Sequence, residues 1–168
     1  MITILFSFLM TTADAAEKLW LRHAELPAVA SSLADAYGRP VKIDRGLCET
    51  FTIEAEGELS ANETRRVLLS SLSAHLYNVI PRDGGYVILN ARMASRDSHD
   101  VAPCRPQFAD VVTWAFRDTM LAMQPTHLMR ALTRDGTLHV APGTDLIIIS
   151  DEAETVQRLR RDLTKGGR

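Results

Sequence analysis

Histidines, serines and paired glycines are the residues of this 168-residue chain that could serve catalysis or hold a cofactor. The histidines lack the HExxH spacing that places two zinc ligands on one helix face. Ser70 and Ser71 lie inside an expected helix, without the G-x-S-x-G pattern of a nucleophile on a sharp turn. Gly84 and Gly85 lack a phosphate-loop pattern and suit a turn. We therefore expect no enzyme, metal, cofactor or small-molecule substrate, and a structural place for each histidine: His23, His75, His99, His127 and His139.

Two cysteines, Cys48 and Cys104, stand far apart in the sequence and have no CxxC or histidine spacing, which argues against a zinc site. One disulfide is consistent with them if the protein is exported, and two buried thiols are the alternative.

The N-terminus has features of an export signal. An apolar run over residues 2–10 is followed by Ala13-Asp14-Ala15, which suits cleavage after Ala15. The run is shorter than the roughly 20 residues of a membrane-spanning helix. No Lys or Arg precedes it, so a buried first strand or a start codon assigned too late are the alternatives. We expect residues 1–15 to be a signal peptide.

The charge balance argues against a nucleic-acid partner. The formal net charge is −2, and 46% of residues are apolar, as in an ordinary soluble globular protein. The second half has the element order of a KH domain but lacks its GxxG loop. A C-terminal basic cluster is interleaved with acidic residues, so helical charge pairing explains it; it comprises Arg158, Arg160, Arg161, Lys165 and Arg168.

Residues 60–89 are the most clearly marked stretch. Ser60 and Glu63 have the spacing of a capping box, which predicts the start of a helix. Leucines at steps of three and four residues predict its apolar face: Leu68, Leu69, Leu72 and Leu76. Two β-rich runs that flank adjacent glycines then predict a hairpin.

The residues before this stretch complete a first module. In a strand from Leu19 to His23, the side chains of Leu19 and Trp20 would point to opposite faces of the sheet. A helix with Pro27 in its first turn would end at Gly38. Apolar and polar residues alternate over residues 41–43 and 51–55, which predicts two strands that each have one solvent-exposed face. Residues 17–92 thus have the order β-α-β-β-α-β-β.

The second module follows a linker. Residues 93–109 are polar, hold two prolines and show no periodicity. Residues 110–165 then predict β-α-β-β-α: a strand from Val111, a helix with Leu128, Met129 and Leu132 inward, two strands, and a helix with a capping-box-like start at Asp151. The expected fold class is α+β, with two small domains, each of two helices packed on a small mixed sheet.

Both modules resemble a known family. Residues 21–44 (LRHAELPAVASSLADAYGRPVKID), 51–57 (FTIEAEG) and 59–89 resemble the short N-terminal periplasmic domain shared by secretins and TonB-dependent receptors. VVTWAF and residues 137–163 are similar to the secretin ring-type domain that follows it. The corresponding strand of this chain reads Thr144-Asp145-Leu146-Ile147-Ile148, in which the Asn of the family's strand is replaced.

The resemblance implies a periplasmic, non-enzymatic protein that works by protein–protein contact in a secretin-type secretion, type IV pilus or phage-export machine. The partner would be an inner-membrane secretion or pilus assembly protein, or a separate secretin pore that holds the chain at the outer membrane. The sequence ends after the second module, so we expect no pore-forming region and a monomeric or weakly associating protein, although homo-oligomeric rings through the second module are a further expectation. The alternative is a signalling domain of the TonB-dependent receptor type that contacts an inner-membrane regulator.

The resemblance also implies where the partner binds. In the family the edge of the first module's sheet is the docking site, and an exposed strand edge can accept a partner strand. Trp20 is the sharpest candidate because an outward aromatic is a natural interface anchor, the alternative being that it covers the domain's own hairpin. The candidate residues are Leu19, Trp20, Leu21, Arg22, Phe51, Thr52, Ile53 and Glu54.

Overall fold

A computed structural model of the chain describes residues 18–91 and 110–166. The expected signal peptide, the expected linker, His99 and Cys104 lie outside these residues. The α+β class and the order of elements are confirmed, with two short helices where the second module was expected to have one. The elements are β1 (Trp20–Glu25), α1 (Leu26–Tyr37), β2 (Val41–Ile43), β3 (Thr50–Ala55), α2 (Ala61–Ala74), β4 (Tyr77–Arg82), β5 (Gly85–Asn90), β6 (Val111–Arg117), α3 (Thr119–Met123), α4 (Thr126–Ala131), β7 (Thr137–Val140), β8 (Leu146–Glu152) and α5 (Ala153–Gly166).

The strands form two sheets, and one of them joins the two halves of the chain. The order β1-β3-β6-β8-β7 makes a five-stranded sheet, while β2-β5-β4 makes a three-stranded one. The junction is a parallel pairing of β3 with β6, in which Thr52 lies opposite Val112 and Ala55 opposite Ala115. The other neighbours in the larger sheet are antiparallel. The two sequence modules therefore share one sheet.

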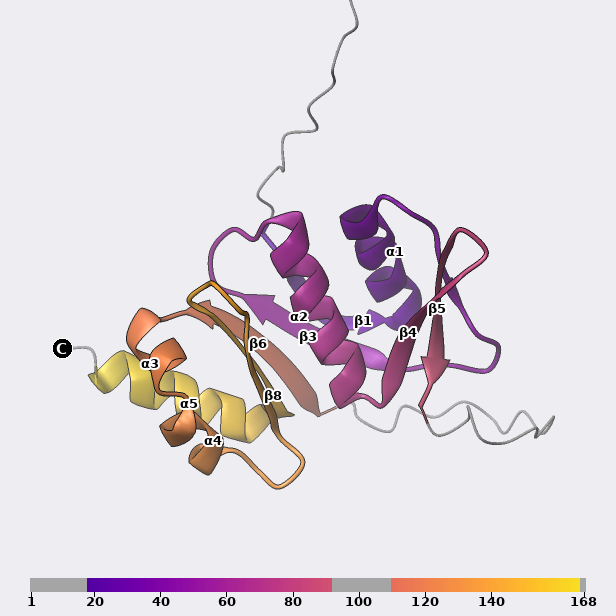
Figure 1. Cartoon of the computed structure of the whole chain (residues 1–168). Helices are drawn as coiled ribbons and strands as arrows, with labels where there is room; N and C mark the ends of the chain where they lie inside the picture. Colours follow the sequence, from indigo (N-terminus) through magenta and orange to yellow (C-terminus); the bar gives the residue numbers. More distant parts are fainter. Residues whose placement is uncertain (1–17, 92–109, 167–168) are drawn as a thin grey trace, which may run out of the picture.

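The helices form layers around the larger sheet (Figure 1). Helices α1 and α2 pack on each other, and α2 contacts β4 of the small sheet as well as β3, β6 and β8 of the large one. Helix α2 thus lies between the two sheets. Helix α5 packs on β6 and β8 from the other face, with α3 against β8 and α4 against β7.

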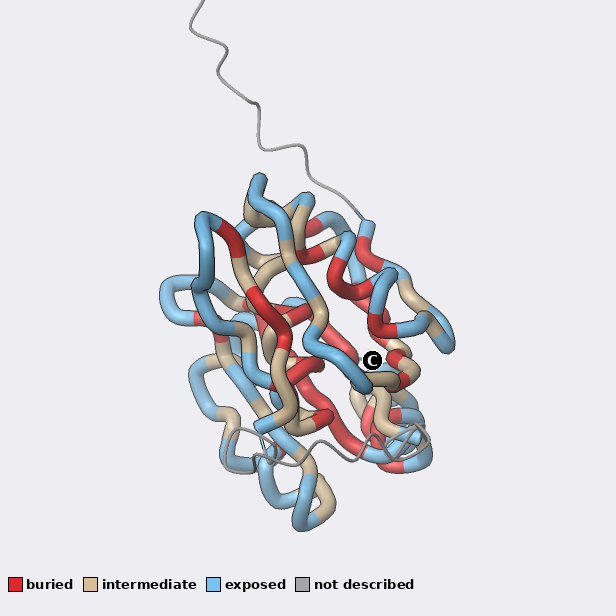
Figure 2. The backbone as a smooth tube through the Cα atoms, turned by 90° about the vertical axis from the view of Figure 1, so that its right-hand side faces the viewer, coloured by how far each residue is buried: buried red, intermediate tan, exposed pale blue. Residues whose placement is uncertain are grey.

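Strands β6 and β8 supply both hydrophobic cores because their side chains alternate between the two faces. Ala115 and Ile148 join the first core, which is centred on α1, α2 and β3, whereas Trp114 and Ile149 join the second core beneath α5. Figure 2 shows that the buried segments run through the interior and that the turns outside them are exposed. Each half therefore depends on the other for part of its packing.

The expected start of α2 and the expected hairpin are confirmed. Ser60 Oγ accepts a hydrogen bond from the Glu63 N–H, and the Glu63 carboxylate accepts one from the Ser60 N–H, which is a complete capping box. The β4–β5 hairpin turns through Asp83 and Gly84, at φ +49° and +78°. Positive φ at both central residues is the requirement of the tight turn that joins twisted strands.

Three local expectations were wrong. Met129 is 60% exposed, because α4 is only six residues long and buries Leu128 alone. Asp151 lies in β8 and not at a helix cap; its carboxylate accepts hydrogen bonds from the N–H and hydroxyl of Thr133 at 2.8 and 2.5 Å. Glu54 is on the face expected to be wet, yet it is only 6% exposed.

Among the described helices, none combines the length and the apolar character that a membrane crossing requires.

Candidate functional site

Strand β1 forms one outer edge of the five-stranded sheet as far as the chain is described. Its inner edge pairs with β3, and the Ala55 N–H donates to the Leu19 carbonyl at 3.0 Å. Hydrogen-bonded and non-hydrogen-bonded pairs alternate along antiparallel strands. Trp20, which lies opposite Glu54, therefore directs its own N–H and C=O away from β3. These two main-chain groups can accept an added strand.

A bulge interrupts β1 directly after this point. The register with β3 shifts between Leu21 and Ala24, and His23 has a φ of +48°. The His23 N–H donates to Thr52 Oγ1 at 3.4 Å. A bulge bends an edge strand and redirects the neighbouring side chains. The regular part of the open edge consequently ends at Leu21.

Trp20 is an exposed aromatic with two cations beside its ring. It is 45% exposed, the Arg22 guanidinium lies 4.7 Å from the ring centroid and the Lys18 amine lies 5.8 Å from it. Each such contact at an exposed position contributes about 0.5–1 kcal/mol. These contacts orient the ring on the surface, and none of them is with the β4–β5 hairpin.

Glu54 is held between two arginines from distant parts of the chain. Arg22 Nε donates to Glu54 Oε1 at 3.0 Å, and Arg160 Nη1 of α5 donates to Glu54 Oε2 at 2.5 Å. Arg160 also lies over the Trp114 ring at 4.9 Å. The ion pairs compensate the burial of Glu54, since a buried carboxylate is tolerated when it is paired.

These residues form one row across the sheet. Trp20 of β1 lies opposite Glu54 of β3, which in turn lies opposite Trp114 of β6. Directly paired residues share a sheet face. Arg22 and Arg160 lie over the two ends of the row, and the Trp114 indole N–H donates to Glu56 at 2.9 Å. We call Lys18, Trp20, Arg22 and Glu54 the edge cluster.

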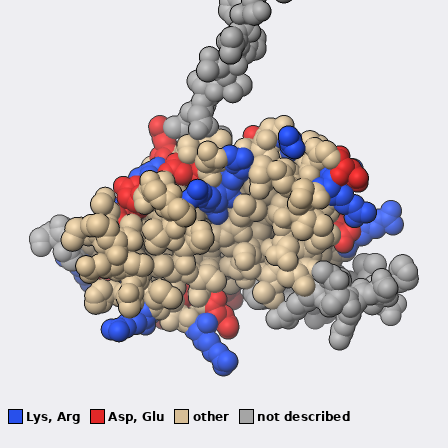
Figure 3. Space-filling model, in the orientation of Figure 1, with Lys and Arg blue, Asp and Glu red and all other residues tan. Residues whose placement is uncertain are grey.

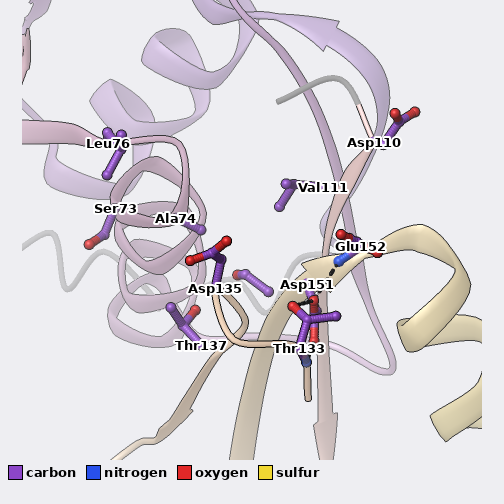
Figure 4. A pocket seen from close by; sticks show the side chains of 11 residues that line it. Ser73, Ala74, Leu76, Asp110, Val111, Thr133, Asp135, Thr137, Asp151 and Glu152 are labelled. Atoms are coloured by element: carbon purple, nitrogen blue, oxygen red, sulfur yellow. Dashed lines mark hydrogen bonds between the residues drawn. The ribbon is translucent and has the colours of Figure 1, made fainter. Parts of the chain in front are cut away.

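A second feature is a pocket of about 480 Å³ at the seam between the two halves (Figure 4). Its lining holds several carboxylates and, among the described residues, neither histidine, cysteine, lysine nor arginine. Both oxygens of Asp151 are engaged by Thr133. The hydroxyls in the lining thus have no imidazole or amine to activate them. The lining residues are Ser73, Ala74, Leu76, Asp110, Val111, Thr133, Asp135, Thr137, Ser150, Asp151 and Glu152.

Charge and metal-ligand geometry give no other candidate in the described ranges. No group of three or more His, Cys, Asp or Glu side chains could hold a metal there. Lys, Arg, Asp and Glu are interspersed on the face drawn in Figure 3 and do not gather into one basic surface. Cys48 is disulfide-bonded, whereas Cys104 lies outside the described residues, so the predicted pairing of these two stays a prediction.

Comparison with solved structures identifies the fold. The structure of XcpQN012 covers 91% of this chain at a TM-score of 0.72 and 15% sequence identity. The N-terminal domain of the secretin XcpQ from Pseudomonas aeruginosa covers 89%, at 0.69 and 16%. The chain has the fold of secretin N-terminal domains.

A third structure agrees with this assignment. It is a chain of the GspC–GspD complex of the type II secretion system from enterotoxigenic Escherichia coli, with a TM-score of 0.60 and 13% sequence identity. The match covers 90% of the present chain and 98% of that one. The chain spans 65% and 64% of the two XcpQ structures. No protein-family model and no curated protein sequence matches it.

Within this secretin-type fold, only half of the predicted binding residues lie at an edge. Leu19 to Arg22 form or adjoin the outer strand β1. Phe51, Thr52, Ile53 and Glu54 belong to β3, which pairs with β1 on one side and β6 on the other. Its backbone cannot accept a partner strand, so these residues are corrected from edge to interior positions. Phe51 and Ile53 are core side chains at 0% exposure.

Sequence reasoning missed the second half of the row in this secretin-type fold. Arg160 and Trp114 lie 106 and 60 positions beyond Glu54 in the sequence. Periodicity carries no information on which distant strands pair. The available signal was the resemblance of both halves to consecutive secretin domains, and it did not specify their pairing.

Proposed function

We propose that the chain is a non-enzymatic periplasmic component of a secretin-type secretion, type IV pilus or phage-export machine. Its role is to bind an inner-membrane partner or a separate secretin pore through the open edge of β1. The observation that carries this proposal is the agreement with secretin N-terminal domains over both halves of the chain, 91% of its length.

The edge of β1 supports the docking role physically. Trp20 offers a main-chain N–H and C=O, and its exposed indole lies beside them. A partner strand would gain backbone hydrogen bonds from the edge and apolar contact from the ring. The GspC–GspD complex of a type II secretion system is a precedent, because a chain similar to this one occurs there in a complex.

The test is affinity capture of the tagged chain from envelope extracts of its own host, with mass spectrometry of the bound proteins. We expect inner-membrane secretion or pilus components, or a secretin pore, and expect Trp20→Ala to reduce their recovery about tenfold, the loss typical of an interface anchor. Ile80→Ala is the matched control, since Ile80 is an exposed apolar residue on β4, in the other sheet. Recovery of an anti-sigma regulator would favour the signalling role instead. Cytoplasmic proteins alone would contradict the proposal.

A further inference from the structure

The edge cluster is cationic on the side that a partner strand would meet. Arg22 and Lys18 both flank Trp20, and the Arg22 side chain is 62% exposed. The carboxylate in the cluster, that of Glu54, has each oxygen bound by a different arginine. Its negative charge is therefore already compensated within the chain, and the exposed charge of the cluster is positive.

Arg22 retains donors for a second carboxylate. Its Nε binds Glu54, while in the described part of the chain Nη1 and Nη2 have no hydrogen-bond partner. A guanidinium carries five N–H donors in a fixed plane, which suits two-point binding of a carboxylate. The contact with Glu54 also fixes the orientation of this plane beside the Trp20 ring.

The register of β1 determines where the carboxylate would have to be. A strand added at the open edge would pair with the outward N–H and C=O of Trp20. The residue opposite Trp20 shares its sheet face, and side chains of directly paired residues lie about 4.5–5.5 Å apart at Cβ. A Glu or Asp side chain at this position would lie beside the Trp20 ring, and the Arg22 guanidinium is 4.7 Å from the centroid of that ring. The bulge after Leu21 limits regular pairing to the first residues of β1.

We infer that Trp20 and Arg22 form a carboxylate-selective docking site for a short, extended, acidic segment of the partner protein. The inference rests on the proposed function and specifies its partner: an added strand that places an Asp or Glu opposite Trp20. Lys18 adds to the attraction without a directed contact. Arg22 sets the specificity of the site, whereas Trp20 and the strand edge supply the contact area.

The test titrates isotope-labelled full-length protein with peptides of about eight alternating Thr and Val residues, the length of an ordinary strand. The three peptides carry Glu, Gln or Lys at one central position, and two-dimensional NMR follows the Trp20 backbone amide. We expect the Glu peptide to bind roughly threefold to tenfold more tightly than the Gln peptide and the Lys peptide to bind most weakly, because the ion pair is partly exposed. The difference should shrink when NaCl rises from about 0.05 M to about 0.5 M.

Variants separate specificity from folding. Arg22→Gln should reduce binding of the Glu peptide to the level of the Gln peptide and leave the Gln peptide unchanged. Arg39→Gln, at an exposed arginine after α1, should change neither. The Arg22 variant should keep its fold because Glu54 retains Arg160.

Several results would overturn the inference. These are equal binding of the Glu and Gln peptides, no shift at Trp20 with any peptide, or shifts confined to β7 or β2. Shifts at Trp20 that appear with protein concentration alone would assign the edge to a second copy of the chain. The capture experiment tests the proposed function separately, because it does not depend on the charge of the partner segment. A partner with a neutral segment would still be recovered there.

Discussion

At the scale of single residues, carboxylates connect the two halves of this chain. Glu54 joins β1 to α5 through Arg22 and Arg160, and Glu63 joins the start of α2 to β6 through Arg117. Arg117 also binds Asp145 at 2.9 Å. Each carboxylate thus makes contacts between segments far apart in the sequence, and Glu63 also completes the capping box of α2. Charge-assisted hydrogen bonds of this kind are stronger than neutral ones.

Glu63 should make stability depend on acidity. Burial acts to raise the pKa of Glu63, but the Ser60 N–H, the Arg117 guanidinium and the Ser60 hydroxyl outweigh it and hold the pKa below its ordinary value of 4.5. A carboxyl whose pKa is lower in the folded state contributes stability above its unfolded pKa and loses it as the pH falls through its folded pKa.

We therefore expect the free energy of unfolding to decrease as the pH falls below about 4.5, and Glu63→Gln to flatten this decrease while lowering stability at neutral pH. Urea unfolding at a series of pH values measures both effects. Glu58→Gln is a control, because Glu58 is exposed. An unaltered pH profile in the Glu63 variant would show that other carboxyls cause the acid sensitivity.

At the scale of elements, α2 is the central packing unit because both sheets contact it. Leu68 and Leu72 are fully buried and Leu69 is partly buried against the first core, as the predicted apolar face requires, with Val67 and Ser71 buried beside them. Leu76, which was expected on the same helix face, lies beyond the end of α2 at φ +61°. By contrast, α3 and α4 hold exposed methionines: Met120, Met123 and Met129, at 60–70% exposure. Substitutions in these two sets should have opposite consequences.

Leu72→Ala should lower the free energy of unfolding by roughly 2–5 kcal/mol, since it removes buried methyl groups and leaves a cavity between α2 and its neighbours. Met129→Ala should change it by less than about 0.5 kcal/mol, as is usual at exposed positions. Denaturant unfolding of the two variants beside the wild type measures the difference. Similar losses in both variants would contradict the packing described for α2 and α4.

The elements were largely predictable from sequence, and their assembly was not. Some features depend only on residues close together in the sequence, and the sequence pattern therefore predicts them. They are the helix cap at Ser60, the helix end at Gly38 and the turn at Asp83. The outward facing of Trp20 followed from simple alternation. The interior position of Phe51 to Glu54 depends on a second neighbour, β6, which lies some sixty residues later. The pairing of Glu54 with Arg160 depends on the same assembly.

At the scale of the whole molecule, the shared sheet makes the two sequence modules one packing unit. Strand β3 would lose a neighbour if the second half were absent, and the first core would lose Ala115, Leu146 and Ile148. Single domains of this size usually unfold in an all-or-none manner, and here the two cores lie on opposite faces of one sheet and share its strands. The pattern of burial thus favours a single folding unit over two independent ones.

We expect one cooperative thermal transition, in which the calorimetric and van 't Hoff enthalpies agree. Trp20→Phe leaves Trp114 as the only tryptophan, so fluorescence then reports on the second half while far-ultraviolet circular dichroism reports on all elements. The two curves should coincide. Separate midpoints would indicate that the halves unfold independently despite the β3–β6 pairing.

The bulge at His23 has a consequence for self-aggregation. An exposed, regular edge strand can recruit identical strands and grow into a fibre, and natural proteins limit such growth with bulges and charges. The edge of β1 has both, since its register breaks after Leu21 and Lys18 and Arg22 flank Trp20. A short foreign segment can dock there, whereas a second β1 would lose register within a few residues and bring like charges together. The protein can thus present an open strand at high local concentration without polymerising through it.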